Sequence, residues 1–168
     1  AVPSLIGIDI KDNTEKVEFY SDNKLEQVIS AFSGKEVSIE LGYLTKEIES
    51  MISGNKYEEG VYIQDSNAVA NEVALMFKAP LSRGGFRYVC LYKGILAKDE
   101  SSYKTKVEGQ TVTLSGVFAP LTSNGIPSIE VDDNDKKLTD KQKTMIRNWF
   151  TQVPVYASTS LGRAKETK

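Results

Sequence analysis

The sequence contains no histidine, and this absence excludes a large class of chemistry. Histidine is the commonest general base and the commonest transition-metal ligand, and it completes the usual serine and cysteine nucleophile pairs. The chain of 168 residues also has a single cysteine, Cys90, which excludes an intramolecular disulfide. Cys90 lies between Val89 and Leu91, as is typical of a buried structural thiol. We therefore expect no enzymatic activity and a fold held by packing and backbone pairing.

Long apolar runs and a surplus of basic residues are also lacking. No run approaches the roughly 20 apolar residues that a membrane helix needs. The first residues lack the basic start and long apolar core of a signal peptide, so we expect a cytoplasmic origin and no membrane partner. The net charge of −2 disfavours a protein that grips nucleic acid through clustered Lys and Arg. With 40% hydrophobic and 26% charged residues, the composition predicts one globular domain.

Two polar motifs lack residues that ligand-binding loops require. The acidic run from Asp132 to Asp135 begins like an EF-hand loop, but Lys137 and Lys143 occupy the positions of its glycine and glutamate. The pair Gly84 and Gly85 is not followed by the lysine and serine of a phosphate loop. A weak cation site of another kind stays open at the acidic run. The sequence otherwise predicts no metal and no cofactor.

Most of what is present follows strand patterns. Residues 36–41 alternate cleanly, with Val37, Ile39 and Leu41 predicted on one side of a pleat and polar residues on the other. Further strands are expected at residues 16–20, 60–64, 72–78, 86–94, 110–118 and 126–131. Pro80 should end the strand before it, and Gly84 with Gly85 should allow a hairpin turn.

Two short helices should interrupt the strands. Thr45 can cap a helix over residues 45–53, which Gly54 would terminate. A second is expected over residues 139–152, begun by a capping box of Thr139 and Gln142 and ended by Pro154. Its apolar residues should face the core, and they are Met145, Ile146, Trp149 and Phe150. The prediction is a mainly β domain with flanking helices over residues 1–156, followed by a polar tail at 157–168.

Several segments, taken in order, resemble the major tail tube proteins of long-tailed, siphovirus-type phages, the phi13-like major tail proteins among them. The most informative stretch is residues 86–106, where an aromatic strand is followed by an acidic group and then by Tyr-Lys-Thr-Lys. The other segments in the family's order are residues 19–23, 37–41, 60–63, 74–78, 113–118, 132–133 and 148–150. Each segment is weak alone, so the resemblance rests on their order and spacing.

The resemblance implies a structural role. Tail tube proteins are antiparallel β-sandwiches flanked by a helix, and six copies close into a ring with a continuous inner β-barrel. Stacked rings form the conduit for DNA ejection in the virion tail, which is assembled in the host cytoplasm. The implied partners are further copies of the chain, a tape measure protein and tail-end proteins. Viral DNA would pass through without specific binding.

Two sets of residues are candidates for tube functions. Short, polar or acidic side chains on two strands could face the lumen, namely Glu36, Ser38, Glu40, Thr111, Thr113 and Ser115. An ordinary solvent-exposed face explains either strand equally well. The connection over residues 96–108 is too polar for a core and too long for a hairpin turn, so it should contact neighbouring subunits. Its candidate residues are Lys98, Asp99, Glu100, Tyr103, Lys104 and Lys106.

Two other functions remain open from the sequence. A tube subunit of a bacterial secretion system or a tail-like killing system would share the architecture. A monomeric β-sandwich module that binds surfaces or carbohydrates would be expected to expose aromatic side chains as a platform. Against this last function, Phe86, Tyr88 and Tyr92 alternate along one strand as core residues do.

Overall fold

The computed structural model describes residues 4–21, 24–101 and 111–156, with the backbone alone at residues 15–31. The elements are β1 (Leu5–Ser21), β2 (Lys24–Leu41), α1 (Lys46–Ser53), β3 (Lys56–Glu58), β4 (Val61–Ile63), β5 (Val73–Pro80), β6 (Phe86–Lys98), β7 (Val112–Ala119), β8 (Ser128–Asp132) and α2 (Asp140–Arg147). The predicted polar tail at 157–168 lies outside the described residues.

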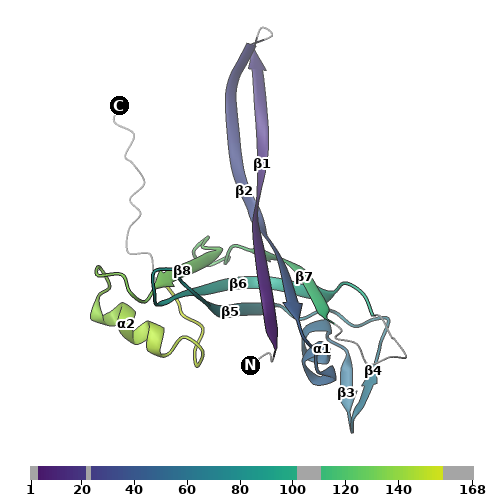
Figure 1. Cartoon of the computed structure of the whole chain (residues 1–168). Coiled ribbons are helices and arrows are strands. Elements are labelled where there is room, and N and C mark those ends of the chain that lie inside the picture. Colours follow the sequence, from purple (N-terminus) through teal and green to yellow (C-terminus); the bar gives the residue numbers. More distant parts are fainter. Residues whose placement is uncertain (1–3, 22–23, 102–110, 157–168) are drawn as a thin grey trace.

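A curled antiparallel sheet forms the centre of the molecule (Figure 1). Its strand order is β1-β2-β7-β6-β5, and β8 also pairs with β6. β3 and β4 form a separate two-stranded hairpin. The two helices lie toward opposite ends of the sheet, with α1 beside the β3–β4 hairpin (Figure 1). This arrangement confirms the predicted mainly β fold with flanking helices.

The core is built around β6, which carries buried apolar side chains on both faces. One cluster lies on the α1 side and consists of Val37, Ile39, Leu41, Ile52, Val89, Leu91, Leu96, Leu114 and Phe118. The other joins Cys90 and Tyr92 to Trp149, beyond the end of α2. Leu91 and Leu96 both belong to the first cluster, although residues five apart in a regular strand point to opposite faces. A β-bulge in β6, opposite β5, adds one extra residue between them and so returns both side chains to the same face.

The predicted helix starts are confirmed. The hydroxyl of Thr45 accepts a hydrogen bond of 3.3 Å from the Ile48 amide, and Gly54 follows α1 with a φ of 73°. At α2 the Gln142 side chain accepts from the Thr139 amide at 2.8 Å, and the Thr139 hydroxyl accepts from the Gln142 amide at 3.4 Å. These bonds satisfy amides that the first helical turn leaves unpaired.

The predicted end of the second helix is wrong. α2 stops at Arg147, and residues 148–152 form turns, so Pro154 does not terminate it. Trp149 is fully buried as expected, but Phe150 is 55% exposed. The turns after Arg147 break the helical spacing that would have placed Phe150 on the same face as Trp149.

Two strands are far longer than the sequence patterns indicate. The predicted strand at residues 16–20 is only part of β1, and the predicted strand at 36–41 is only the last third of β2. β1 pairs with β2 from Leu5 opposite Leu41 to Ser21 opposite Lys24. β2 pairs with β7 only from Lys35 to Leu41, so the outer part of this ribbon projects from the sheet (Figure 1).

Several other boundaries also differ from the prediction. Pro80 is itself the last residue of β5. Proline has no backbone N–H to donate, and an edge strand such as β5 tolerates it because one side of the strand has no hydrogen-bonding partner. β6 continues to Lys98, and β7 begins at Val112, which leaves Thr111 before the strand. β3 was not predicted. The hairpin turn at residues 81–85 is confirmed, with the Leu81 amide donating to the Gly85 carbonyl at 3.0 Å.

Candidate assembly surfaces

The structure brings most predicted lumen residues onto one face of the sheet. Ser38 of β2 stands opposite Ser115 of β7, and Glu40 stands opposite Thr113. Residues directly opposite in an antiparallel pair project to the same side. Glu36 belongs to the same alternation, and it is exposed like Glu40. The intervening Val37, Ile39 and Leu41 are at most 4% exposed and face the main core, which confirms the predicted alternation of this strand.

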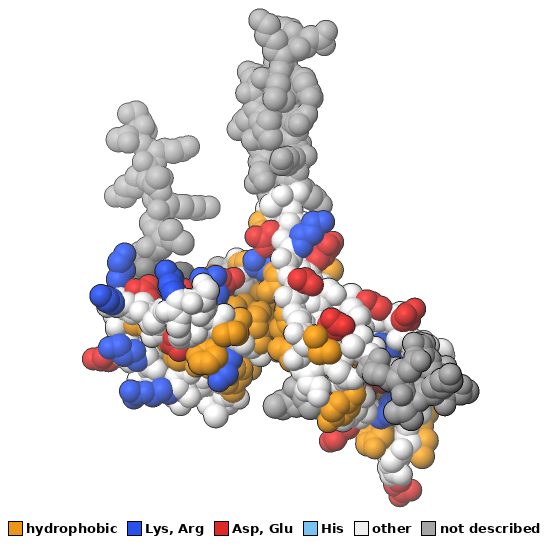
Figure 2. All heavy atoms as spheres, viewed as in Figure 1, with side chains coloured by type: hydrophobic (Ala, Val, Ile, Leu, Met, Phe, Trp, Pro, Cys, Tyr) orange, Lys and Arg blue, Asp and Glu red, His pale blue; other side chains and the backbone are white. Residues whose placement is uncertain are grey.

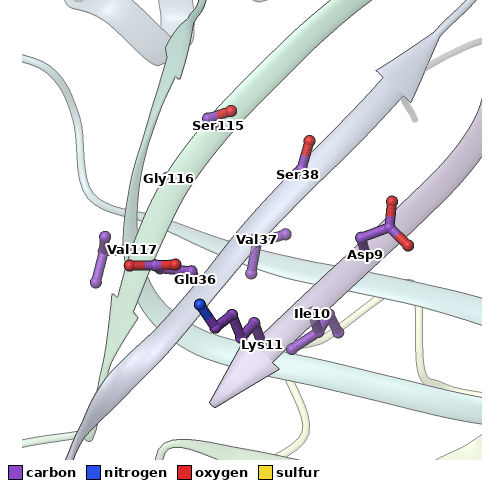
Figure 3. Close-up of a pocket in the computed structure, with 9 residues that line it drawn as sticks. All are labelled: Asp9, Ile10, Lys11, Glu36, Val37, Ser38, Ser115, Gly116 and Val117. Atoms are coloured by element: carbon purple, nitrogen blue, oxygen red, sulfur yellow. The ribbon is translucent and has the colours of Figure 1, made fainter. Parts of the chain in front are cut away.

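β1 extends this polar face by one strand. Asp9 lies opposite Ser38, and Lys11 lies opposite Glu36. Together with Ser115 and neighbouring residues of β7, they line an open hollow of about 570 Å³ (Figure 3). Figure 3 also shows the Lys11 side chain extending toward Glu36. We call this surface of β1, β2 and β7 the polar face.

The charge of the polar face is acidic but unevenly distributed. Glu36 accepts a hydrogen bond of 2.7 Å from the Asn13 side chain and has Lys11 opposite it, which partly balances its charge. Glu40 is flanked by Gly7 and Thr113, neither of which carries a charge. Glu40 therefore contributes more uncompensated negative charge than Glu36.

The predicted connection contributes to the same face at its start. Lys98 is the last residue of β6, so its assignment to a loop is wrong. The Asp99 amide donates to the Thr113 carbonyl at 3.1 Å, and its carboxylate accepts from the Ser115 hydroxyl at 2.8 Å. Asp99 is thus held against β7 as part of the polar face.

The remaining candidates are placed less closely together. Glu100 is exposed beside a second hollow of about 420 Å³ between α1 and the end of β6. Thr111 is exposed but precedes β7 and has no place in the β2–β7 register. Tyr103, Lys104 and Lys106 lie outside the described residues.

The sheet has two terminal strands on its main path, β1 and β5, and β8 is a further edge because among the described residues it pairs only with β6. β1 and β5 end the strand order, and within the described residues no further strand pairs with their outer sides. Such edges present backbone amides and carbonyls that can pair with another chain. Regular spacing of apolar residues signals a strand but not its position in a sheet. Pro80 is the one local signal that favours an edge position for β5, and β1 carries no such residue.

Cys90 is packed in the core, and Asp132 and Asp133 form hydrogen bonds within the fold. Cys90 is fully buried, and the loss of hydration raises the pKa of its thiol to about 11. Arg87 donates to both carboxylate oxygens of Asp132 at 2.7 and 3.0 Å, and these bonds lower the pKa of Asp132. The next carboxylate, Asp133, accepts from the Phe86 amide at 2.9 Å. Asp132 in β8 and Asp133 in the loop after it are thus hydrogen-bonded to Arg87 and Phe86 at the start of β6.

Among the described residues, no group of three or more Asp, Glu, His or Cys side chains is placed to hold a metal ion. In the same part of the chain, neither helix has the length and apolar character needed to cross a membrane. Comparison with known proteins gives no assignment, since no protein-family model and no curated protein matches the chain.

Proposed function

We propose that the chain is the structural subunit of a phage tail tube, assembling into stacked hexameric rings that conduct DNA. The observation that carries this proposal is the β1–β2 ribbon. Outside the stretch Lys35–Leu41 that pairs with β7, β2 is paired only with β1, and the ribbon extends away from the sheet (Figure 1). The resemblance of ordered sequence segments to the tail tube family points the same way.

An isolated two-stranded ribbon is a poor structure for a free monomer. Two strands alone are at best marginally stable in water, and they need a third strand or a packing surface to persist. In the described part of the chain, no other strand pairs with the outer part of the ribbon. A second subunit supplies the missing surface, so we interpret the ribbon as an arm that contacts a neighbouring copy.

The two edge strands support closure into a ring. β1 and β5 lie at opposite ends of the sheet, so the β1 edge of one copy can meet the β5 edge of the next and continue the sheet. A head-to-tail contact of this kind closes into a ring when the rotation between copies closes. Unpaired strand edges can cause aggregation by pairing with other chains. In a closed ring the β1 and β5 edges pair with neighbouring subunits, so that neither stays exposed. The number six comes from the family resemblance.

The polar face suits the wall of a DNA conduit. Lys or Arg contacts to phosphates release counterions and would create attractive wells along the path of moving DNA. The acidic residues Asp9, Glu40 and Asp99 instead repel phosphates, and salt screens that repulsion over about 8–10 Å. DNA would therefore slide without strong contacts, which is the behaviour expected of a tube that binds no specific sequence.

Shortening the arm tests this proposal. Residues 16–30 would be removed and the register partners Glu15 and Ala31 joined by Asn-Gly, which favours a tight hairpin turn. Electron microscopy and sedimentation of the full chain should show rings or tubes at high concentration, whereas the shortened chain should stay folded but unassembled. The control carries Thr122→Ala and Ser123→Ala, two exposed residues outside the deleted segment, and should assemble normally. Normal tubes from the shortened chain, or a full chain that remains monomeric, would contradict the proposal.

Tubes alone would not separate a phage tail from a secretion or killing tube, since the architecture is shared. Neighbouring genes provide that distinction: tape measure and portal genes indicate a phage tail, and secretion baseplate genes indicate the other systems. A monomeric binding module receives no support from the aromatic residues of β6. Tyr92 is buried and Tyr88 packs edge-on against Trp149, as core residues do. Phe86 is 38% exposed and lies under the Lys78 ammonium, so its predicted core position is wrong, but one partly exposed ring does not make an aromatic platform.

A further inference from the structure

The two ends of the molecule carry opposite net charge. The α2 end, defined as residues 78–87 and 130–147, has eight Lys or Arg against five Asp or Glu, a net charge of +3. The α1 end, defined as residues 46–65, has two Lys against five Asp or Glu, a net charge of −3. Figure 2 shows Lys and Arg side chains gathered over the α2 end. The α1 end lies at the other side of the ribbon (Figure 1).

Much of this charge is not neutralised within the described residues. At the α2 end, Arg83 and Arg87 pair with Asp132, and Lys143 lies 3.5 Å from Asp140. The exposed cations without an acidic partner in the described residues of this end are Lys78, Lys136, Lys137, Lys141 and Arg147, of which Lys78 lies over the Phe86 ring.

The α1 end shows the converse pattern. Lys46 lies 2.9 Å from Glu49. The exposed Glu47, Glu58 and Glu59 have no cationic partner in the part of the chain that the structure describes. The opposite charges are therefore available to a second molecule.

Both ends also expose large apolar side chains among these charges. At the α1 end, Met51 is 59% exposed and Val61 is 58% exposed. Beside the α2 end, Phe150 is 55% exposed and Val155 is 70% exposed. An apolar centre with a charged rim is the usual anatomy of a protein interface. Charge and apolar exposure together mark both ends as contact surfaces.

We propose that the α2 end of one copy docks on the α1 end of the next copy. Unlike charges attract when the two ends meet head to tail, whereas two α1 ends or two α2 ends repel each other. The contact is therefore heterologous, and its repetition leads to a ring or an open filament. This inference rests on the proposed tube function and deepens it by adding a second contact between neighbouring copies, beside the pairing of the β1 and β5 edges.

Charge reversal at each end provides the test. One variant carries Lys136→Glu, Lys137→Glu and Lys141→Glu, which changes the α2 end from +3 to −3. The other carries Glu47→Lys, Glu58→Lys and Glu59→Lys, which changes the α1 end from −3 to +3. All six side chains are exposed, so circular dichroism should show both variants folded. A third chain combines all six changes and restores opposite charges at its two ends.

Sedimentation at about 50 mM and at several hundred millimolar salt would measure association, and electron microscopy would identify the assemblies. Each single-end variant should associate at least about tenfold more weakly than the original chain at the lower salt concentration, because both of its ends carry the same sign. An equimolar mixture of the two variants should regain assembly by alternating copies. The combined variant should assemble by itself.

The results separate this inference from the proposed function. If either single-end variant assembles like the original chain, or if the mixture and the combined variant fail to recover, the docking of the two ends is wrong even when the original chain forms tubes. If the original chain forms charge-dependent chains that never close into rings or tubes, the docking stands and the tube function is wrong. An original chain that remains monomeric at every concentration overturns both.

Discussion

Gly94 lies against the ring of Phe118. The two residues stand opposite each other on β6 and β7, and a Cβ atom on Gly94 would lie 2.3 Å from Phe118 Cδ1. Phe118 is fully buried in the cluster on the α1 side. The glycine is therefore required by close packing of the ring against the backbone, and not by a turn.

Replacing Gly94 by alanine should destabilise the fold by about 1–3 kcal/mol, because the added methyl group forces the Phe118 ring or a strand to shift. Urea unfolding would measure the change. Gly7→Ala is the matched control: it lies in β1 and would meet no atom within 4 Å. Equal free energies of unfolding for the Gly94→Ala and Gly7→Ala proteins would show that the close contact between Gly94 and Phe118 does not limit stability.

The Arg87–Asp132 pair should make stability depend on pH. Hydrogen bonding by Arg87 lowers the folded-state pKa of Asp132 below the unfolded value of about 3.9. The pair therefore stabilises the fold fully above the unfolded pKa, and its contribution is lost as the pH falls through the lowered folded pKa. Asp132→Asn should reduce the urea midpoint at pH 6, and its difference from the original chain should shrink as the pH falls below the unfolded pKa. Glu58→Gln, which alters an exposed carboxylate, should show a small difference throughout. A constant deficit for Asp132→Asn over the whole range would refute this assignment.

Cys90 should be inert in the folded protein. It is fully buried, and its pKa of about 11 leaves little thiolate at pH 8. An aromatic disulfide reagent should label it at least about 100-fold more slowly than an exposed cysteine introduced by Thr122→Cys. In denaturing urea the two thiols should react at similar rates. Rapid labelling of native Cys90 would indicate that the second core cluster opens readily.

Features governed by neighbouring residues were predictable from the sequence. The caps at Thr45 and Thr139, the glycine hairpin turn and the alternation of residues 36–41 all depend on contacts within a few residues. The long ribbon was not predictable in the same way. Its polar residues interrupt apolar alternation, since a ribbon outside the sheet has no core-facing side to specify.

The candidate site was recognised only in parts for a related reason. The pattern separated Glu36, Ser38 and Glu40 from their apolar neighbours, but it gave no register between β2 and β7. Pairing of Ser38 with Ser115 joins residues far apart in the chain and depends on the whole sheet. The bulge in β6 and its extension to Lys98 are likewise set by the partner strands β5 and β7.

The charge of the polar face leads to the prediction that most directly tests its role as a lumen. Glu36→Lys together with Glu40→Lys reverses two charges on the polar face while leaving the buried Val37 and Ile39 unchanged. The subunit should fold and should assemble at moderate salt, but its tubes should retain DNA and its virions should eject their genome slowly or incompletely.

The matched control is Glu36→Gln with Glu40→Gln, which removes both negative charges without adding positive ones. Its tubes should retain much less DNA than the double-lysine tubes, because glutamine forms no ion pair with phosphate. The single variants add a finer test: Glu40→Lys should have the larger effect, since Glu36 already faces Lys11 and bonds to Asn13. Double-lysine virions that eject at the normal rate, or a tube structure with Glu40 on its outer surface, would exclude the polar face as the wall of the conduit.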